Sequence, residues 1–206
     1  MTIKKELVTL SKLIEEKGFV NAYEGNISIM DRKNKKVYFT PSGTRKLTLT
    51  EEMVAVLDEN EKQIEGTLRH SSEYKLHLAA YKFREDCNAV IHAHSPYLTA
   101  FAMLGKEIYA ECSAEFLTFG GKIPVVPWGE KGTYDIIGNL GELLQDYKLV
   151  LLECHGVLCV DKDLETCFKM LEAAENTVHS WIIATQIGTP KSIPVWNELL
   201  KKTKKN

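Results

Sequence analysis

Short strand-like and helix-like segments alternate along the whole chain, and this alternation limits its fold more than any other feature. Apolar and polar residues alternate in NISIM at 26–30 and in KVYFT at 36–40, with a polar turn between them. This pattern predicts a β-hairpin. A second hairpin is expected where VAVLD at 54–58 and QIEG at 63–66 flank another polar turn. Neighbouring short hairpins of this kind are typical of antiparallel sheets.

Segments with the helical spacing of apolar residues lie between the strand-like runs. Helices are predicted at 3–18, at 71–83 with a serine cap and an acid in its first turn, after Pro96, at 134–145 and at 163–186. Further strands are predicted at 88–94, 148–154 and 157–160, with an extended segment at 122–128. We therefore expect an α/β fold, a central mostly antiparallel or mixed sheet flanked by helices.

The length of 206 residues allows one sizeable hydrophobic core. We find no internal repeat, low-complexity tract or linker-like run, so residues 1–206 are predicted to form a single domain. The basic segment 201–206 is expected to be a solvated end.

Charge and cysteine content restrict the partners and the compartment. The formal net charge is −2, so no global field attracts nucleic acid or an anionic membrane, and neither is expected as a partner. The N-terminus lacks the apolar core of a secretory signal, and no stretch approaches the ~20 apolar residues of a membrane-spanning helix. Five cysteines, an odd number set in or beside apolar segments, favour free and mostly buried thiols in a reducing compartment. A cytoplasmic protein is predicted.

Three histidines form the main candidate for a metal site. His92 and His94 are two residues apart in a predicted strand, so both imidazoles project from the same face. His155 is predicted to end another strand, and Gly156 after it lets the backbone pass close to whatever the imidazole contacts. Three histidines with an open fourth position are typical of a catalytic zinc site rather than a structural one.

A single histidine in a core is more often a hydrogen-bonded structural residue, and an isolated H-x-H pair is weak evidence for a metal. His70 and His179 lack any supporting context. His77 lies four residues after Glu73 on the same predicted helix face, so it is either a ligand or orienting partner, or a packing or interface residue. We favour packing or an interface for His77.

Glu73 is the candidate acid. At the start of a predicted helix, a glutamate has a structural explanation in a favourable helix-dipole interaction of about 0.3–1 kcal/mol. Its functional interpretation is a carboxylate that binds the metal at rest and acts as a general base when substrate arrives.

Three short segments have a composition suited to binding phosphate. Small residues let backbone N–H groups approach an anion, and hydroxyls and an amide add further donors. Each segment alone would be an ordinary turn or cap, but all three lie upstream of the H-x-H strand. The candidate phosphate-binding residues are Gly25, Asn26, Ser42, Gly43, Ser71 and Ser72.

The order of these motifs resembles the class II aldolase/adducin family, and within it the L-fuculose-1-phosphate aldolases. The resemblance runs from about residue 3 to 186 and rests on E-G-N-I-S, T-P-S-G, S-S-E-x-x-x-H, A-V-I-H-A-H-S and E-C-H-G-V-L. It implies a mostly antiparallel sheet between helices and a homotetramer with active sites at subunit interfaces.

The resemblance also implies the roles of the residues. His92, His94 and His155 would bind one zinc ion per subunit, Glu73 would be an alternating ligand and acid/base, and the six residues above would bind the substrate phosphate. The implied reaction is retro-aldol cleavage of a ketose 1-phosphate to dihydroxyacetone phosphate and an aldehyde such as lactaldehyde.

Two departures from the family pattern affect the substrate. The fuculose-phosphate aldolases carry a tyrosine, reaching over from the neighbouring subunit, at about the position of Ser113, and a phenylalanine near Lys131. A serine is a far poorer proton donor to an oxygen than a phenol. The resemblance therefore predicts the reaction class more firmly than the sugar.

Related functions remain open. Ribulose-phosphate 4-epimerases of the same superfamily carry aspartate where Glu73 stands, which favours an aldolase here. A methylthioribulose-phosphate dehydratase or a sugar-acid phosphate decarboxylase shares the metal ligands and is not excluded. A non-catalytic, adducin-like oligomerisation module is disfavoured, because a scaffold has no need of three histidines and Glu73.

Overall fold

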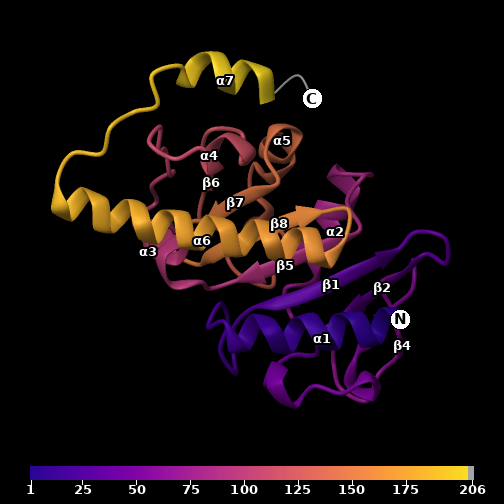
Figure 1. Cartoon of the computed structure of the whole chain (residues 1–206). Coiled ribbons are helices and arrows are strands. Elements are labelled where there is room, and N and C mark those ends of the chain that lie inside the picture. The colour runs from indigo at the N-terminus through magenta and orange to yellow at the C-terminus, as the bar shows by residue number, and fades with distance from the viewer. Residues whose placement is uncertain (204–206) are drawn as a thin grey trace.

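The computed structural model describes residues 1–203, and its strands form one eight-stranded sheet (Figure 1). The strands are β1 (Asn26–Asp31), β2 (Lys36–Phe39), β3 (Ala55–Leu57), β4 (Gln63–Glu65), β5 (Ala89–Ala93), β6 (Val125–Val126), β7 (Leu149–Leu152) and β8 (Gly156–Asp161). Their order is β4-β3-β2-β1-β5-β8-β7-β6. Every neighbouring pair is antiparallel except β6 and β7, which are parallel. The predicted mixed, mostly antiparallel sheet and both predicted hairpins are confirmed.

The helices lie on both faces of this sheet. The α-helices are α1 (Ile3–Glu16), α2 (Tyr74–Phe83), α3 (Pro96–Met103), α4 (Glu115–Thr118), α5 (Leu140–Asp146), α6 (Leu164–Ile187) and α7 (Trp196–Thr203). Short 3-10 helices are η1 (Lys46–Thr48), η2 (Glu51–Met53) and η3 (Asp135–Ile137). Good caps explain the two best-predicted helices, because Thr2 accepts a hydrogen bond from Lys5 N in α1 and Asp163 accepts one from Thr166 N in α6.

Strand alternation divides the core into two layers. On β5, Ile91 packs with α1, α3 and α6, whereas Val90 packs on the opposite face with α2 and α5. On β8, Cys159 and Leu158 divide in the same way. Because side chains two residues apart on a strand share a face, His92 lies on the same face as Val90, which α2 and α5 cover.

Two predicted helices differ from the structure. The helix expected at 134–145 is interrupted at Gly138, where a φ of +46° separates η3 from α5. The helix expected at 71–83 begins only at Tyr74, and its cap position is Glu73, not a serine. The Ser71 hydroxyl instead accepts a hydrogen bond from Glu73 N at 3.2 Å, so the chain is still turning toward the helix at these residues.

Two helices were not predicted, α4 and α7. α4 has only four residues and α7 only eight, so neither is long enough for the helical spacing of apolar residues to recur over the window of about 11–18 residues that such a prediction needs. Of the segment expected to be a solvated end, residues 201–203 form the exposed last turn of α7. The remainder of that segment, 204–206, lies outside the described residues.

A buried glutamate joins α6 to α3. Glu175 is 4% exposed, and its two carboxylate oxygens accept hydrogen bonds from Tyr97 N at 2.8 Å and Leu98 N at 3.0 Å. These N–H groups lie in the first turn of α3, where no earlier residue of the helix can accept from them. Glu175 therefore satisfies the start of α3 from another element.

All five cysteines are free thiols, as predicted. Cys87, Cys159 and Cys167 are buried, Cys112 is half-buried and Cys154 is exposed. Among residues 1–203, no helix combines the length and apolar character needed to cross a membrane.

Candidate metal and anion site

The three predicted histidines meet at one end of the β5–β8 pair. His92 is in β5, His94 follows the end of that strand, and His155 lies in the turn between β7 and β8. The Nε2 atoms of His92 and His94 are 3.0 Å apart, and one ligand atom from each of the three rings lies within 4.8 Å of the others. Imidazole nitrogens bound to one tetrahedral zinc ion are about 3.3 Å apart. The sequence pattern thus identified a real cluster.

His155 does not end a strand, as its apolar neighbours had suggested. β7 stops at Leu152, and Cys154 takes a φ of +56° in the tight turn that precedes β8. The backbone N–H of His155 donates to Leu152 O at 3.0 Å and closes this turn. The turn is what directs the imidazole toward His92 and His94.

Gly156 is needed for the histidines to approach each other. A Cβ atom at this position would lie 2.5 Å from Ala93 O and 3.3 Å from atoms of both the His92 and His94 rings. A real Cβ does not tolerate the first of these contacts, so a side chain here would push β8 away from the end of β5. The predicted close approach at Gly156 is present.

Hydrogen bonding and burial keep the histidines neutral. The Nδ1–H of His92 donates to Val157 O at 3.0 Å, which leaves its Nε2 lone pair facing the cluster. Burial, with the neighbouring histidines, lowers the pKa of His92 and of His94 to about 3. Burial also lowers the pKa of His155. Neutral imidazoles with free lone pairs are the form that binds a metal.

Glu73 lies against this cluster and is 7% exposed. Its Oε2 accepts a hydrogen bond from Asn26 Nδ2 at 2.7 Å and lies 3.7 Å from His92 Nε2. Its Oε1 lies 3.3 Å from His155 Nε2 and has no hydrogen-bond partner among the described residues. A buried carboxylate oxygen without a partner is costly, and a bound cation beside it would relieve that cost. The donor set of three imidazoles and a carboxylate therefore fits a metal ion.

The predicted anion segments surround Glu73. Gly25 has a φ of +71°, and a Cβ there would lie 2.9 Å from His92 O, so the loop before β1 must pass very close to β5. Asn26 is 4% exposed and pairs with His92 across β1 and β5. The backbone of this loop is therefore held next to the histidines.

The other two segments are brought together by a short bridge. Pro41 pairs with His70, and Ser42 N donates to Arg69 O at 2.9 Å, which sets the 41–43 turn beside Ser71 and Ser72. Gly43 has a φ of +64° with open space around it. Ser42, Gly43 and Ser72 are accessible, whereas Ser71 is buried. The exposed members are available to an anion.

Lys46 lies beside this region and was missed from the sequence. It is 3% exposed, and its ammonium donates to Glu24 O at 2.8 Å, directly before Gly25. Burial lowers its pKa. A single lysine between a turn and a threonine-rich segment carries no sequence signal for such burial.

The remaining histidines lie outside the cluster. His77 is fully buried, its Nδ1 is 2.7 Å from Ser28 Oγ, and burial lowers its pKa to about 3, which agrees with the packing role favoured for it. His70 contacts the Tyr74 ring edge-on, and His179 stacks on Tyr97 with ring centroids 4.0 Å apart.

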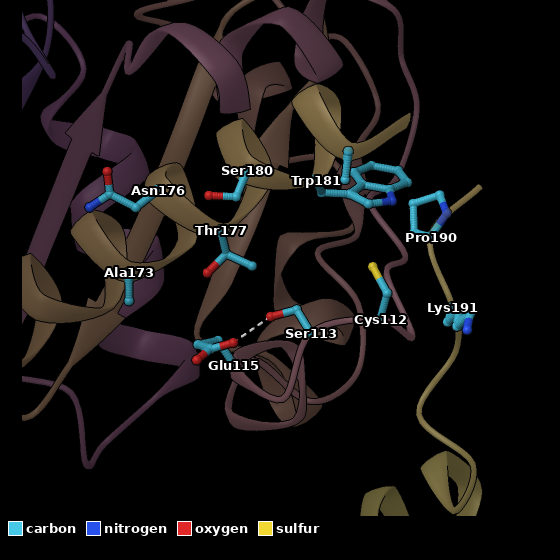
Figure 2. Close-up of a pocket in the computed structure, with 11 residues that line it drawn as sticks. Cys112, Ser113, Glu115, Ala173, Asn176, Thr177, Ser180, Trp181, Pro190 and Lys191 are labelled. Carbon is cyan, nitrogen blue, oxygen red and sulfur yellow. Dashed lines mark hydrogen bonds between the residues drawn. The ribbon is translucent and has the colours of Figure 1, made fainter. Parts of the chain in front are cut away.

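Ser113 and Lys131, the two positions that depart from the family pattern, lie in different parts of the structure. Ser113 lines a separate cavity of about 600 Å³ between the start of α4 and the side of α6, together with Thr177, Ser180 and Trp181 (Figure 2). Its hydroxyl is hydrogen-bonded to Glu115 there. Lys131, in contrast, follows β6; burial is the main cause of the lowered pKa of the three histidines, and the charge of Lys131 adds a smaller contribution.

Comparison with known proteins gives consistent matches over nearly the whole chain. The family model of the class II aldolase and adducin N-terminal domain matches residues 5–182. A 5-deoxy-D-ribulose 1-phosphate aldolase of Bacillus thuringiensis serovar kurstaki is 32% identical over 192 residues, covering 93% of this chain and 89% of the relative. An L-fuculose phosphate aldolase of Escherichia coli strain K12 is 31% identical over 174 residues, covering 84% of this chain and 79% of the relative.

Solved structures agree with these matches. An L-fuculose 1-phosphate aldolase superposes with a TM-score of 0.88 at 29% identity and covers 98% of this chain and 96% of its own. A sugar-phosphate aldolase from Thermotoga maritima superposes with a TM-score of 0.75, covering 92% of this chain and 97% of its own, and its 20% identity supports the fold alone.

Proposed function

The chain belongs to the class II aldolase and adducin family and is an aldolase-type lyase, and we propose that it cleaves a ketose 1-phosphate to dihydroxyacetone phosphate and an aldehyde. The observation that carries this proposal is the convergence of His92, His94, His155 and Glu73, with one Glu73 oxygen left unpartnered. A lyase that breaks a carbon–carbon bond beside a carbonyl needs both an electrophile for the carbonyl oxygen and a group that exchanges a proton at carbon.

We propose that the three histidines and Glu73 hold one zinc ion per subunit. Imidazole nitrogens and a carboxylate suit zinc, and the His92 Nδ1–H bond to Val157 O orients that ligand in the way typical of metal-binding histidines. Zinc bound there would supply a Lewis acid that polarises the substrate carbonyl.

Glu73 is the proposed acid/base. The Asn26 amide holds one of its oxygens, while the other is free of hydrogen bonds and faces the cluster. A carboxylate in this position can take up or deliver a proton at the substrate carbon next to the carbonyl, the carbon that carries the negative charge once the bond breaks. The Asn26 contact keeps the carboxylate oriented while that proton moves.

The proposed phosphate site consists of Gly25, Asn26, Ser42, Gly43, Ser71 and Ser72. Its exposed hydroxyls and backbone N–H groups lie at the entrance to α2, where the helix start adds partial positive charge. Asn26 contacts Glu73, so the phosphate site adjoins the reacting end of the substrate. A phosphate one carbon away from the carbonyl suits this arrangement.

The relatives support a ketose 1-phosphate as the substrate class. One acts, by its name, on 5-deoxy-D-ribulose 1-phosphate and the other on L-fuculose phosphate. These sugars share the phosphorylated end and differ in the part that becomes the aldehyde. We propose an L-fuculose 1-phosphate-like ketose, with lactaldehyde as the aldehyde when fuculose phosphate is the substrate.

We further propose a cytoplasmic homotetramer with its active sites at subunit interfaces, built from a single domain over residues 1–206. Support comes from the cavity that Ser113 lines, because Trp181 on the side of α6 and Ser113 before α4 border an open, partly apolar surface that a second copy can cover.

The test is a panel of ketose 1-phosphates and 5-phosphates assayed for triose phosphate release, with and without a chelator. We expect release from 1-phosphates alone, abolished by the chelator and restored by zinc. Release from 5-phosphates only, or release that the chelator leaves unchanged, would refute the proposal. The mass of the native protein in solution tests the tetramer, and a monomer with full activity would contradict it.

A further inference from the structure

The loop 127–134, between β6 and η3, is fixed to the metal and anion site at three points. At its start, Trp128 N donates to Glu153 Oε2 at 2.8 Å, next to the turn that carries His155. Further on, Gly132 packs near Ser72, since a Cβ there would lie 3.6 Å from Ser72 O. At its end, the Lys75 ammonium lies 4.5 Å from the centre of the Tyr134 ring. The loop therefore bridges from the His155 turn to the start of α2.

Lys131 lies between the first two of these anchors. It is exposed, and within residues 1–203 its side chain makes no hydrogen bond or ion pair. Its place is set by the loop, because Glu153 directly precedes the turn that carries His155, and Gly132, the residue after Lys131, packs near Ser72. The side chain is thus a cation at the site with its donors free.

Sheet order places this cation across the histidines from most of the proposed phosphate site. Gly25 and Asn26 lead into β1, and Ser42 and Gly43 follow β2, on one side of β5. The loop that carries Lys131 follows β6, at the other edge of the sheet beyond β8 and β7. A substrate with its phosphate on the β1–β2 side and its carbonyl at the histidines would extend its remaining carbons toward Lys131.

Cleavage creates a need for a second proton-exchanging group at that end. When the C3–C4 bond of the ketose breaks, the C4 hydroxyl must lose its proton to become the aldehyde carbonyl, while C3 gains one. Glu73 is the group proposed for C3. In this chain the family's tyrosine is replaced by Ser113, whose hydroxyl is hydrogen-bonded to Glu115 and is a far poorer proton donor than a phenol, so another group is needed at C4.

We propose that Lys131 is a catalytic residue that exchanges the proton on the C4 oxygen; this inference rests on the proposed aldolase function. In the condensation direction, C3 attacks the aldehyde carbon, the carbonyl π pair becomes an alkoxide lone pair on the C4 oxygen, and the Lys131 ammonium donates a proton to it. In cleavage, the neutral amine takes the C4 hydroxyl proton as the C3–C4 electron pair returns to C3. Solvent restores the resting protonation state of the amine.

The test separates the chemistry at C4 from the chemistry at C3. Lys131→Met removes the charge at similar length, and Lys131→Arg keeps a cation. Lys62→Met, an exposed lysine in the β3–β4 turn, outside the proposed metal and phosphate residues, is the matched control. Each zinc-loaded variant is assayed for ketose 1-phosphate cleavage, for exchange of the C3 proton of dihydroxyacetone phosphate with deuterated water, and for zinc content.

We expect Lys131→Met to lower kcat for cleavage by about 10²-fold, the low end of the range for a proton-transferring side chain. Its C3 exchange and zinc content should match those of the wild type, and Lys131→Arg should recover part of the cleavage rate. The Lys62→Met variant should be unchanged in all three measurements.

Unchanged kcat in Lys131→Met would overturn the inference. So would a rise in KM alone, which would make Lys131 a phosphate-binding residue, or an equal loss of C3 exchange and cleavage. A wild type that neither exchanges the C3 proton nor cleaves any ketose 1-phosphate would instead refute the proposed function itself, and the role of Lys131 with it.

Discussion

Two buried glutamates lie on opposite faces of the sheet and have opposite hydrogen-bonding environments. Glu175, on α6, is 4% exposed, and both of its oxygens accept backbone N–H groups of α3. Glu73, before α2, is 7% exposed, and only one of its oxygens has a hydrogen-bond partner among the described residues. The other faces His155.

This difference separates a structural carboxylate from the proposed catalytic one. Burying a charge costs several kcal/mol unless hydrogen bonds compensate, and Glu175 receives that compensation from the protein itself. Glu73 is left with one oxygen unpartnered, and in the proposed function a metal ion or a proton completes it. Of two glutamates with similar burial, the one whose carboxylate lacks a hydrogen-bond partner is therefore the better candidate for a catalytic role.

The largest expected effect comes from removing a histidine beside Glu73. His94→Ala should lower metal affinity by more than about 100-fold, beyond the loss typical of residues that only orient a ligand, and abolish cleavage. The fold should survive, because His94 lies outside the strands. Metal analysis, activity and circular dichroism check this, with His179→Ala on the opposite face as control. Full turnover in His94→Ala would contradict the metal site.

Glu73→Gln should separate function from stability. The glutamine oxygen can keep the Asn26 bond, and the buried charge is removed, so the free energy of unfolding should not fall. Proton exchange at C3 of dihydroxyacetone phosphate should drop by about 10²–10⁴-fold with zinc still bound. Proton NMR in deuterated water measures the exchange. An unchanged exchange rate would assign the base to another residue.

Glu175→Gln should lower stability and leave the activity of the folded protein unchanged. A glutamine offers one acceptor to two N–H groups of α3 and turns a donor toward the other, which leaves a buried group unsatisfied. The free energy of unfolding in urea should fall by about 1–3 kcal/mol, while activity per folded molecule stays near wild type. Glu172→Gln on the same helix, whose partner Lys17 is exposed, should change it by less than about 1 kcal/mol. Equal losses in both variants would remove the distinction.

Asp86, an exposed carboxylate, should make the smallest contribution to stability of the carboxylates compared. Hydrogen bonds from Arg84 lower the pKa of Asp86 to about 2, although the Asp86 side chain is 62% exposed. Because the folded-state pKa is lowered from a typical value of about 3.9, the pair contributes stability above pH 4 and loses it as the pH falls toward 2. Solvent screening limits the contribution to less than about 1 kcal/mol. The difference in unfolding free energy between wild type and Asp86→Asn should shrink between pH 5 and pH 2. A difference that grows on acidification would contradict this.

The sequence predicted the sheet, both hairpins and the histidine cluster because these depend on local patterns. Alternation in 88–94 alone places His92 and His94 on one face, and a glycine after His155 marks a close approach. The start of α2 was mispredicted because Ser71 and Ser72 have good capping chemistry, whereas the long-range bond from Asn26 to Glu73 holds that segment out of the helix.

Residue type and spacing therefore determined which side chains are the candidates for binding a metal and an anion, since strand periodicity and side-chain chemistry are properties of short segments. The tertiary structure alone decided which buried carboxylate is satisfied and which is not. That outcome depends on N–H donors of α3 reaching Glu175 across 77 and 78 residues, and on the His155 turn reaching Glu73 from beyond β5. The tertiary structure likewise placed the loop that carries Lys131 beside the His155 turn, through the Trp128–Glu153 hydrogen bond and the packing of Gly132 near Ser72, contacts that no local pattern encodes.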